Sequence, residues 1–390
     1  MKHRSSNRGS AGPLQSAAMA LLLLWLLLGY AAILTLALRL SSPTGLWQAT
    51  ILLLADLPLL LLVIQVVSIP KRLQRLPRCL LAVLDLLLTA AQFVLPWLGW
   101  SALLFLANGR GLSASACLRA GAAIALFSYL TGLALLVIFR PRAESVRVTR
   151  HEIPLLDLPS PFDGYQILHI SDMHAGLFLS LPALARRLAP AAALRPDLVV
   201  FTGDLSSRGP DAVQAAARLL GALSGRDGIA AVLGNHDSWI GDEFVTTALE
   251  AQGVKVLANT HLVLSRGQTK LYLAGVSDAS YLRRDDLTSA LRGIPDDATV
   301  ILLSHSPDIV RKPPAARAAL VLSGHTHGGQ VVLPWLGPLY VPSRLGRRHA
   351  SGLHRIVGQW LFINRGLGEV FPPLRINCPP EIALLTLRRP

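Results

Sequence analysis

The chain has 390 residues, enough for two domains, and carries a formal net charge of +14. Its three cysteines, Cys79, Cys117 and Cys378, exclude a disulfide framework and a metal site built from paired cysteines, and this usage fits a reducing compartment. The sequence contains no internal repeat of about 20 to 50 residues, which argues against a duplicated transporter.

Residues 1–140 contain only two acidic side chains, Asp56 and Asp85. Both are costly inside a bilayer and count as functional candidates there, and we interpret Asp85 as water-accessible or paired with Arg78. Four apolar stretches, each about long enough to cross a bilayer, fill most of this region: Ala17–Leu38, Ala49–Val67, Cys79–Ala107 and Ala120–Phe139. We therefore predict an N-terminal membrane domain over 1–140, an all-α bundle of about four transmembrane helices, and a second domain over 141–390.

Basic residues in the short loops predict the orientation in the membrane, because they are retained on the cytoplasmic side. Eleven of them lie before the first stretch, between the second and third, and after the fourth, against three in the opposite loops. Both termini and the second domain are therefore predicted to be cytoplasmic, in an integral, multi-pass protein of the inner or cell membrane. Pro96 and Gly99 interrupt the third stretch, and one span more or fewer would place the second domain on the opposite side.

The positive charge follows largely from this topology. Residues 1–140 hold 11 basic against two acidic side chains, which leaves +5 of the net charge for the rest of the chain. No recognised nucleic-acid-binding motif accompanies this charge, so nucleic acid is not an expected partner. The remaining charge would help to hold the second domain against anionic membrane lipid.

Beyond Phe139, strand-like and helix-like stretches alternate, which is typical of an α/β domain. Helical patterns at Leu181–Leu194 and Asp211–Leu223 separate several short apolar runs. The stretch Pro334–His354 is rich in Pro, Gly and Arg and is predicted to be a loop. The runs predicted to be buried strands are Ile167–Ile170, Leu198–Phe201, Ile229–Leu233, Val300–Leu303 and Leu320–Leu322.

Five short polar blocks follow apolar runs of this region. In open α/β sheets, functional groups gather beyond the carboxyl ends of the strands, which is where all five blocks fall. Each block offers a carboxylate, an imidazole or an amide that binds a hard or borderline divalent cation. Two cations about 3.5 to 4 Å apart need a shared anionic ligand, for which Asp204 is the best candidate. In chain order, the blocks are Ser-Asp172-Met-His174, Gly-Asp204, Gly-Asn235-His236-Asp237, Ser-His305 and Gly-His325-Thr-His327-Gly-Gly-Gln330.

The spacing within the blocks suits metal binding. Asp172 and His174 can reach one cation if the backbone turns between them, and His325 and His327 repeat this spacing among glycines that allow a close backbone approach. Each block alone has an ordinary explanation; the third, for example, also reads as the start of a helix capped by Asp237. Because five of the eleven histidines fall within the blocks, their joint occurrence favours a metal site.

The blocks resemble the signature of the calcineurin-like metallophosphoesterase superfamily, which is D-x-H, G-D, G-N-H-[DE], H and G-H-x-H in that order. Two segments further on, Asn364–Gly368 and Pro372–Ile382, resemble its membrane-associated, YkuE-like branch. The resemblance implies a two-sheet α/β/β/α sandwich that binds two divalent metal ions. Manganese, iron, zinc, nickel and cobalt all suit a mixed nitrogen and oxygen ligand set.

The resemblance also implies a role for each matching residue. Asp204 is shared by the two metals, and a hydroxide that bridges them attacks phosphorus in line. His236 contacts the phosphate and protonates the leaving oxygen, and Asp237 orients its ring. One metal is held by Asp172, His174 and His327, and the other by Asn235, His305 and His325.

The leading hypothesis is a membrane-anchored phosphoesterase that cleaves phosphomonoester, phosphodiester or pyrophosphate bonds. The anchor favours a lipid-linked substrate, for which the resemblance suggests a UDP-acylated sugar, and a soluble nucleotide or phosphodiester is the other class. The alternative is a membrane sensor or transporter that carries a regulatory domain of this type. Further candidates for binding phosphate are Arg344, Arg347, Arg348 and Arg365. A solvated loop explains the first three better, and a structural turn explains Arg365 at least as well.

Overall fold

The structure, a computed structural model, describes residues 130, 134, 137–138, 145–356, 358–370 and 373–390. Apart from four residues of the last one, the predicted transmembrane stretches lie outside the described residues. Within the part of the chain that is described, no helix combines the length and the apolar character that a membrane crossing requires. The strands all belong to the unit Phe139–Pro390.

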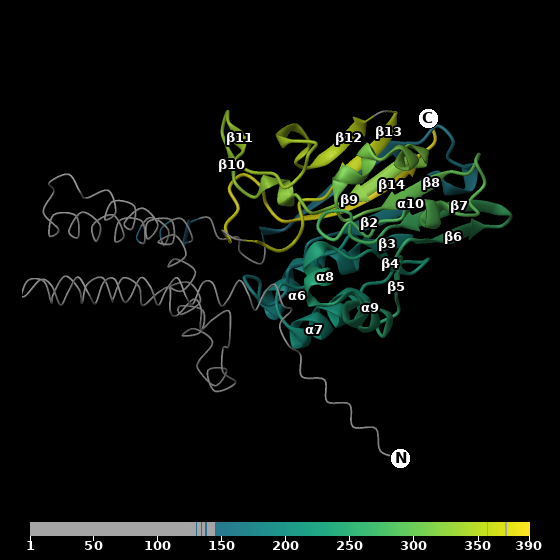
Figure 1. The fold of residues 1–390 in the computed structure, drawn as a ribbon. Helices are drawn as coiled ribbons and strands as arrows, with labels where there is room; N and C mark the ends of the chain where they lie inside the picture. The colour runs from purple at the N-terminus through teal and green to yellow at the C-terminus, as the bar shows by residue number, and fades with distance from the viewer. Residues whose placement is uncertain (1–129, 131–133, 135–136, 139–144, 357, 371–372) are drawn as a thin grey trace, which may run out of the picture. The chain divides into compact units, whose positions relative to one another are not determined.

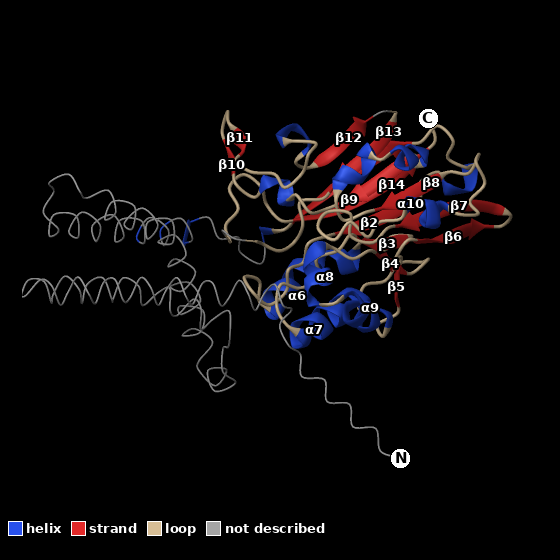
Figure 2. Ribbon diagram, in the orientation of Figure 1, coloured by secondary structure: helices blue, strands red, loops and turns tan. Residues whose placement is uncertain are grey.

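Two six-stranded sheets form the framework of this unit (Figures 1 and 2). The first sheet consists, in spatial order, of β1 (Arg147–Pro154), β14 (Glu381–Arg388), β2 (Gln166–Ile170), β3 (Leu198–Phe201), β4 (Ile229–Ala231) and β5 (Val254–Val256). Strands β2 to β5 are parallel to one another. The C-terminal strand β14 is parallel to β1 and antiparallel to β2, so the end of the chain lies inside the sheet.

The second sheet has antiparallel strands only at its two edges. It consists, in spatial order, of β12 (Gly352–Ile356), β13 (Gln359–Ile363), β9 (Leu320–Ser323), β8 (Val300–Leu303), β7 (Thr269–Gly275) and β6 (Thr260–Arg266). Strands β13, β9, β8 and β7 are parallel, whereas β12 and β6 are antiparallel to their neighbours. A separate short hairpin joins β10 (Val332–Leu333) to β11 (Gly337–Pro338).

A shared hydrophobic cluster fills the space between the two sheets. Successive residues of a strand point to opposite faces, so neighbours in the sequence join different clusters. In β3, Leu198 and Val200 belong to the cluster that also contains Ile301 of β8, whereas Val199 and Phe201 pack towards the helices. Strands buried on both faces need apolar residues at every position, which explains the continuous apolar runs in the sequence.

Helices cover the outer faces of the sheets, as the blue segments of Figure 2 show. The first sheet is covered by α6 (Leu181–Leu188), the 3-10 helix η5 (Ala189–Ala193), α7 (Pro210–Gly221), α8 (Asn235–Ile240) and α9 (Asp242–Glu250). The second is covered by α10 (Leu287–Leu291) and the 3-10 helices η6 (Pro307–Arg311) and η7 (Pro313–Arg317). Three further 3-10 turns are η4 (Ser160–Phe162), η8 (His327–Gly329) and η9 (Arg347–His349).

The predicted α/β domain is confirmed, its two sheets are mixed, and all five predicted strands are present to within two residues. The predicted helix Leu181–Leu194 is divided, because Pro190 has no backbone N–H to continue α6 and lies in the first turn of the tighter η5 instead. The prediction that Pro334–His354 forms a loop is wrong in part. It contains β11, η9 and the first residues of β12, since Gly352 to His354 pair with Leu361 to Ile363.

Candidate metal centre

The five polar blocks follow β2, β3, β4, β8 and β9, each beginning within three residues of the end of its strand. Because β2, β3 and β4 are parallel to one another, as are β8 and β9, the blocks of one sheet leave from the same edge. Contacts between the blocks show that the two edges meet. The His325 backbone N–H donates to Asp172 Oδ2 at 3.1 Å, and His174 Nε2 lies 3.1 Å from His327 Nε2. The fold thus brings together residues from both sheets.

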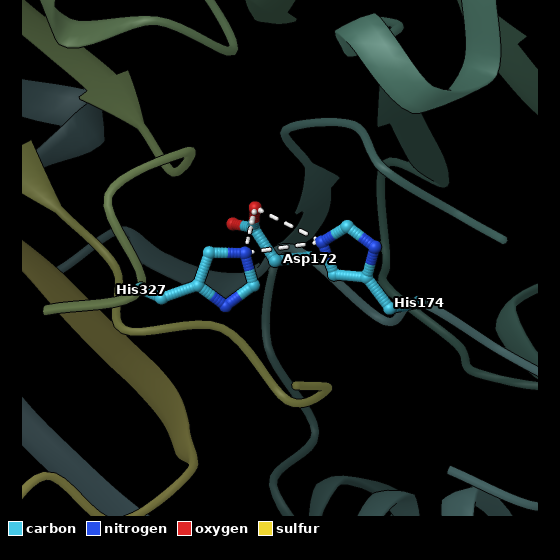
Figure 3. A group of neighbouring side chains, drawn as sticks. All are labelled: Asp172, His174 and His327. Atoms are coloured by element: carbon cyan, nitrogen blue, oxygen red, sulfur yellow. Dashed lines mark hydrogen bonds and ion pairs between the residues drawn. The ribbon is translucent and has the colours of Figure 1, made fainter. Parts of the chain in front are cut away.

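Asp172, His174 and His327 form one group of candidate ligands (Figure 3). Asp172 Oδ1 lies 3.4 Å from His327 Nε2 and 3.8 Å from His174 Nε2. All three residues are buried. A metal ion binds imidazole nitrogen and carboxylate oxygen at about 2.0 to 2.2 Å, so these separations leave room for a common cation.

Asp204, His305 and His325 form a second group beside the first. His305 Nε2 lies 3.3 Å from Asp204 Oδ2 and 3.1 Å from His325 Nδ1. The same Asp204 oxygen lies 3.4 Å from His174 Nε2, which belongs to the first group. One carboxylate oxygen therefore lies between the two groups, as a shared ligand of two cations must.

The hydrogen bonding of His305 fits a cation between this ring and the Asp204 carboxylate. His305 Nδ1 lies 2.6 Å from the Thr202 carbonyl, which can only accept, so Nδ1 carries a proton and Nε2 of the neutral ring has a lone pair. This lone pair faces the Asp204 carboxylate, an unfavourable contact. Burial lowers the pKa of His305, but the Asp204 carboxylate outweighs it and raises the pKa to about 10, so that a second proton separates the two groups. A divalent cation can replace that proton.

Both acidic candidates are ionised at neutral pH. Burial raises the pKa of Asp172 and of Asp204, but the neighbouring imidazoles outweigh burial and hold both pKa values well below the usual range. Serine hydroxyls support the same cluster, since Ser171 Oγ donates to Asp172 Oδ2 at 2.6 Å. His174 Nδ1 lies 2.6 Å from Ser207 Oγ, which orients the ring with Nε2 towards the other ligands.

Five of the seven predicted metal ligands have a left-handed backbone conformation. Such a conformation costs a residue other than glycine about 1 to 3 kcal/mol and is concentrated at functional sites. Backbone hydrogen bonds hold the turns in place, for example from His174 N–H to the Asp204 carbonyl at 3.0 Å. The φ angles are 49° at Asp172, 43° at His174, 60° at Asp204, 69° at His325 and 52° at His327.

Two glycines allow these turns to approach one another. A Cβ atom at Gly324 would overlap the side chains of Ser171 and Asp172, and one at Gly203 would overlap the backbone of Gly234. The glycines in the blocks therefore do more than permit a turn in their own segment, because each makes room for a neighbouring block.

Asn235 and His236 begin α8, beside the Asp204 carboxylate. The His236 backbone N–H donates to Asp204 Oδ1 at 2.9 Å, which holds the start of the helix against the centre. Asn235 is buried, and its amide oxygen lies 3.4 Å from Ser280 Oγ. The third polar block is thus the start of a helix and also part of the centre.

Among the described residues, the Asp237 carboxylate forms no hydrogen bond with the His236 ring that the resemblance expected it to orient. The carboxylate accepts three backbone N–H groups, from Asp204 at 2.8 Å, Leu205 at 2.9 Å and Gly234 at 3.0 Å. The physical reason is its place in the first turn of α8, where a carboxylate caps free N–H groups. Burial and the Asp204 carboxylate raise the pKa of Asp237 to about 7. Asp237 therefore positions the backbone of Asp204.

The His236 ring lies beside the candidate ligands and packs on an aromatic side chain. Its centroid is 4.6 Å from that of His174 and 4.3 Å from that of Trp239, and its Nδ1 lies 3.3 Å from Ser207 Oγ. Burial lowers the pKa of His236 to about 4, so the ring is neutral at pH 7 in the metal-free chain. A ring nitrogen also lies within 4.8 Å of ligand atoms of His174 and Asp204.

Sequence comparison agrees with this arrangement. The sequence model of the family described as calcineurin-like phosphoesterase matches residues 165–329. The chain is also 34% identical over 248 residues to the metallophosphoesterase YkuE of Bacillus subtilis, a match that covers 62% of this chain and 86% of that protein. The chain belongs to the calcineurin-like phosphoesterase family. It is a metal-dependent phosphoesterase of the YkuE-like branch, as its motifs predicted.

Two further relatives extend the comparison. The chain is 28% identical over 246 residues to phosphodiesterase YaeI of Escherichia coli, covering 61% of this chain and 87% of that protein. It is 32% identical over 260 residues to a Danio rerio protein named transmembrane protein with metallophosphoesterase domain, covering 63% of this chain. The chain spans 58% of the length of the Danio rerio protein.

The Asn364–Gly368 segment of this phosphoesterase supports the first polar block. Leu367 N–H donates to the Ser171 carbonyl at 3.0 Å, and Gly368 N–H donates to the Asp172 carbonyl at 2.6 Å. The Asn364 side chain donates to the His169 carbonyl at 2.9 Å. The segment was visible in the sequence as a branch motif, but its structural role was not predicted.

A buried group of charged residues in turn holds this segment, and the sequence analysis missed it. Glu369 pairs with Arg187 at 2.6 Å and with Arg375 at 3.5 Å. Arg375 also donates to the Gly368 carbonyl at 2.6 Å and to the Arg365 carbonyl at 2.9 Å. No local signal marks Arg187, which lies in an amphipathic helix where arginine is usually exposed.

The four arginines singled out in the sequence have different environments. Arg365 Nε donates to Ser351 Oγ at 3.4 Å, so its side chain has a structural partner. Arg347 donates to the Leu336 carbonyl, and Arg348 is exposed. Arg344 differs from these, because it lines a cavity that His325 also lines.

Proposed function

We propose that the centre binds two divalent cations and hydrolyses phosphate esters. The position of Asp204 Oδ2, 3.4 Å from His174 Nε2 and 3.3 Å from His305 Nε2, carries this proposal, because two cations need a shared anionic ligand. In this scheme Asp172, His174 and His327 complete one site, and Asn235, His305 and His325 complete the other. Manganese, iron, zinc, nickel and cobalt all suit such a ligand set.

When bound, the two cations supply a water of lowered pKa as the nucleophile and stabilise negative charge on the phosphoryl oxygens. The chain itself fixes the ligands through its strained turns and orients the substrate through His236. With Nδ1 directed to Ser207, the other ring nitrogen is available to a phosphoryl oxygen. The negative charge of a bound phosphate ester favours the protonated ring, which then donates its proton to the leaving oxygen.

The proposed substrate is a phosphomonoester, a phosphodiester or a pyrophosphate, and a lipid-linked compound such as a UDP-acylated sugar is the preferred class. Membrane anchoring by residues 1–140 would confine the centre to the bilayer surface, where such compounds are concentrated. Exposed apolar side chains near β10 and β11 support contact with lipid. Trp335 is 104% exposed and Leu336 is 56% exposed, and the exposed Arg347 and Arg348 follow them in the chain.

The proposal places the phosphoesterase domain on the cytoplasmic side of the inner or cell membrane. The distribution of basic residues over the loops of residues 1–140 supports this orientation. Alkaline phosphatase fused to the C-terminus should be inactive in a bacterial host, because that enzyme requires export. An active fusion would show that the domain lies on the opposite side of the membrane.

The hydrolytic role can be tested on the full-length protein in detergent, depleted of metal and reconstituted with Mn²⁺. We expect hydrolysis of bis(p-nitrophenyl) phosphate that Asp204→Asn and His325→Ala each abolish, with the loss of at least one metal equivalent by elemental analysis. A His354→Gln control, which changes a histidine outside the two groups, should retain metal and activity. Full activity in both ligand variants would refute the assignment.

A further inference from the structure

A cavity of about 640 Å³ lies next to the candidate metal centre. His325, one of the candidate ligands, is part of its wall, and so is Ser280, whose hydroxyl lies 3.4 Å from the amide oxygen of Asn235. A substrate bound at the centre therefore has this space directly beside it.

The wall of the cavity carries an excess of positive charge. Arg283, Arg311 and Arg344 line it, and among the described residues none of the three forms an ion pair with a carboxylate. A fourth cation in the wall, Lys312, is already paired with Asp285. Three guanidinium groups around one cavity repel one another unless an anion lies between them.

The three arginines come from separate parts of the chain, and the backbone of each part is held in place. Arg311 lies in η6 and donates to the Arg344 carbonyl at 3.3 Å. Asp308, the acidic residue in the wall, accepts the Arg344 backbone N–H at 2.9 Å and the Ser343 hydroxyl at 2.8 Å. The Asp308 carboxylate thus anchors the loop that carries Arg344, through hydrogen bonds from Ser343 and from the Arg344 backbone.

The segment that carries Arg283 is held in the same way. The Asp278 carboxylate accepts the backbone N–H groups of Ser280 at 2.8 Å, Tyr281 at 2.9 Å and Leu282 at 3.0 Å. Burial raises the pKa of Asp278, but these hydrogen bonds outweigh burial and lower it, so the carboxylate remains ionised. Both cationic loops are therefore fixed by a carboxylate at their base.

We propose that this cavity binds a second phosphate group of the substrate while the first reacts at the metal centre. A guanidinium group can bind two phosphate oxygens at once. The three arginines together carry more positive charge than Asp308, the acidic residue of the wall, neutralises. The inference rests on the proposed hydrolysis at the centre and names its substrate class: compounds with two phosphates in sequence, in preference to esters with one. The group attached to such a diphosphate is either water-soluble or a lipid.

The test uses the full-length, Mn²⁺-loaded protein in detergent and three substrates. Bis(p-nitrophenyl) phosphate has one phosphate, UDP-glucose is a soluble compound with two, and farnesyl diphosphate is a lipid with two. For the Arg283→Gln/Arg344→Gln variant, kcat/KM for a diphosphate should fall about 10- to 100-fold more than for bis(p-nitrophenyl) phosphate, mainly through KM. The matched control, Arg218→Gln, changes an exposed arginine of α7 outside the cavity and should show no such difference.

Each outcome decides the inference. The diphosphate that shows the selective loss identifies the soluble or the lipid-linked class. An equal loss on all three substrates, or no loss, would overturn the role of the cavity. If the wild-type protein hydrolyses bis(p-nitrophenyl) phosphate but neither diphosphate, the proposed phosphoesterase function stands and the second-phosphate site fails. If it hydrolyses none of the three, both proposals fail.

Discussion

His236 lies among the candidate ligands, and its role can be separated from theirs. We expect His236→Ala to retain both metal equivalents and to lose about 10² to 10⁴ in kcat, the usual scale of general acid–base catalysis. The reason is that the ring, which packs on Trp239, is not a ligand in the proposed scheme, while the seven proposed ligands remain in place. Metal content by elemental analysis and kcat on bis(p-nitrophenyl) phosphate check this prediction.

A matched control for His236 is available in the same helix. Ser238→Ala changes the residue two positions further along, whose hydroxyl forms no hydrogen bond within the described part of the chain, and should leave kcat and metal content unchanged. Loss of metal from His236→Ala would instead make this histidine a ligand, a role that its ring nitrogen can reach from within 4.8 Å of the ligand atoms of His174 and Asp204.

The chemical identity of the candidate ligands was readable from the sequence, whereas their geometry was not. The spacing of Asp172 and His174 predicted two side chains for one cation. The left-handed backbone at both positions, with φ of 49° and 43°, was not predictable, because it is imposed by hydrogen bonds from distant turns. For the same reason, the sequence offered a capping role for Asp237 but not its hydrogen bonds with the distant backbone of Asp204 and Leu205.

At the scale of the elements, a charged cluster links the two sheets at one edge. Arg266 at the end of β6 donates to both oxygens of Asp227, at 3.0 and 2.6 Å, and the Tyr165 hydroxyl donates to the same carboxylate at 2.6 Å. Asp227 precedes β4 of the first sheet, whereas β6 belongs to the second. The Arg266 guanidinium also lies 5.3 Å from the Tyr165 ring centroid, so the cluster is packed as well as charged.

We expect Asp227→Asn to lower the free energy of unfolding by about 1 to 2 kcal/mol at pH 7, because it removes charge-assisted hydrogen bonds to Arg266. Burial raises the pKa of Asp227, but hydrogen bonds from Arg266 and Tyr165 outweigh burial and lower it. A carboxylate with a depressed pKa stabilises the fold above its unfolded-state pKa of about 3.9 and loses this effect as the pH falls further. The difference between variant and wild type should therefore shrink below about pH 4.

Chemical denaturation at several pH values measures this difference. Glu152→Gln is the matched control, because Glu152 also pairs with an arginine, Arg388, but both side chains are largely exposed, at 67% and 45%. An exposed pair contributes about 0 to 1 kcal/mol, so the control should show a smaller loss. Equal losses from both variants would show that the cluster does not link the sheets in an energetically significant way.

Among the elements, those with strong local signals were predictable. Strands β2, β3, β4, β8 and β9 are buried on both faces, so their continuous apolar runs stand out in the sequence. The position of β14 was not predictable, because it pairs with β1 across the whole domain, where Thr149 and Glu381, 232 positions apart, share a hydrogen bond. Strand β12 was taken for a loop because its glycine and polar residues lack an apolar run.

At the scale of the whole molecule, the candidate centre joins the two sheets, since its ligands follow strands of both. Without cations, the cluster combines strained turns with a buried His305 that holds a second proton beside the Asp204 carboxylate. Cations would take the place of such protons and bind the ligands in the folded state alone. Metal binding should therefore stabilise the fold as well as enable hydrolysis.

We expect metal removal to lower the melting temperature of the full-length protein. A ligand present at 100 times its Kd stabilises the folded state by about 2.7 kcal/mol per site, which corresponds to about 5 to 10 °C for a domain of this size. Differential scanning fluorimetry with and without EDTA, alongside elemental analysis, measures the shift. In Asp204→Asn the shift should be much smaller, because the shared ligand is lost, whereas Asp227→Asn should keep the full shift at a lower starting temperature. An unchanged melting temperature after complete removal of metal from the wild type would separate the centre from the stability of the fold and contradict its role in joining the sheets.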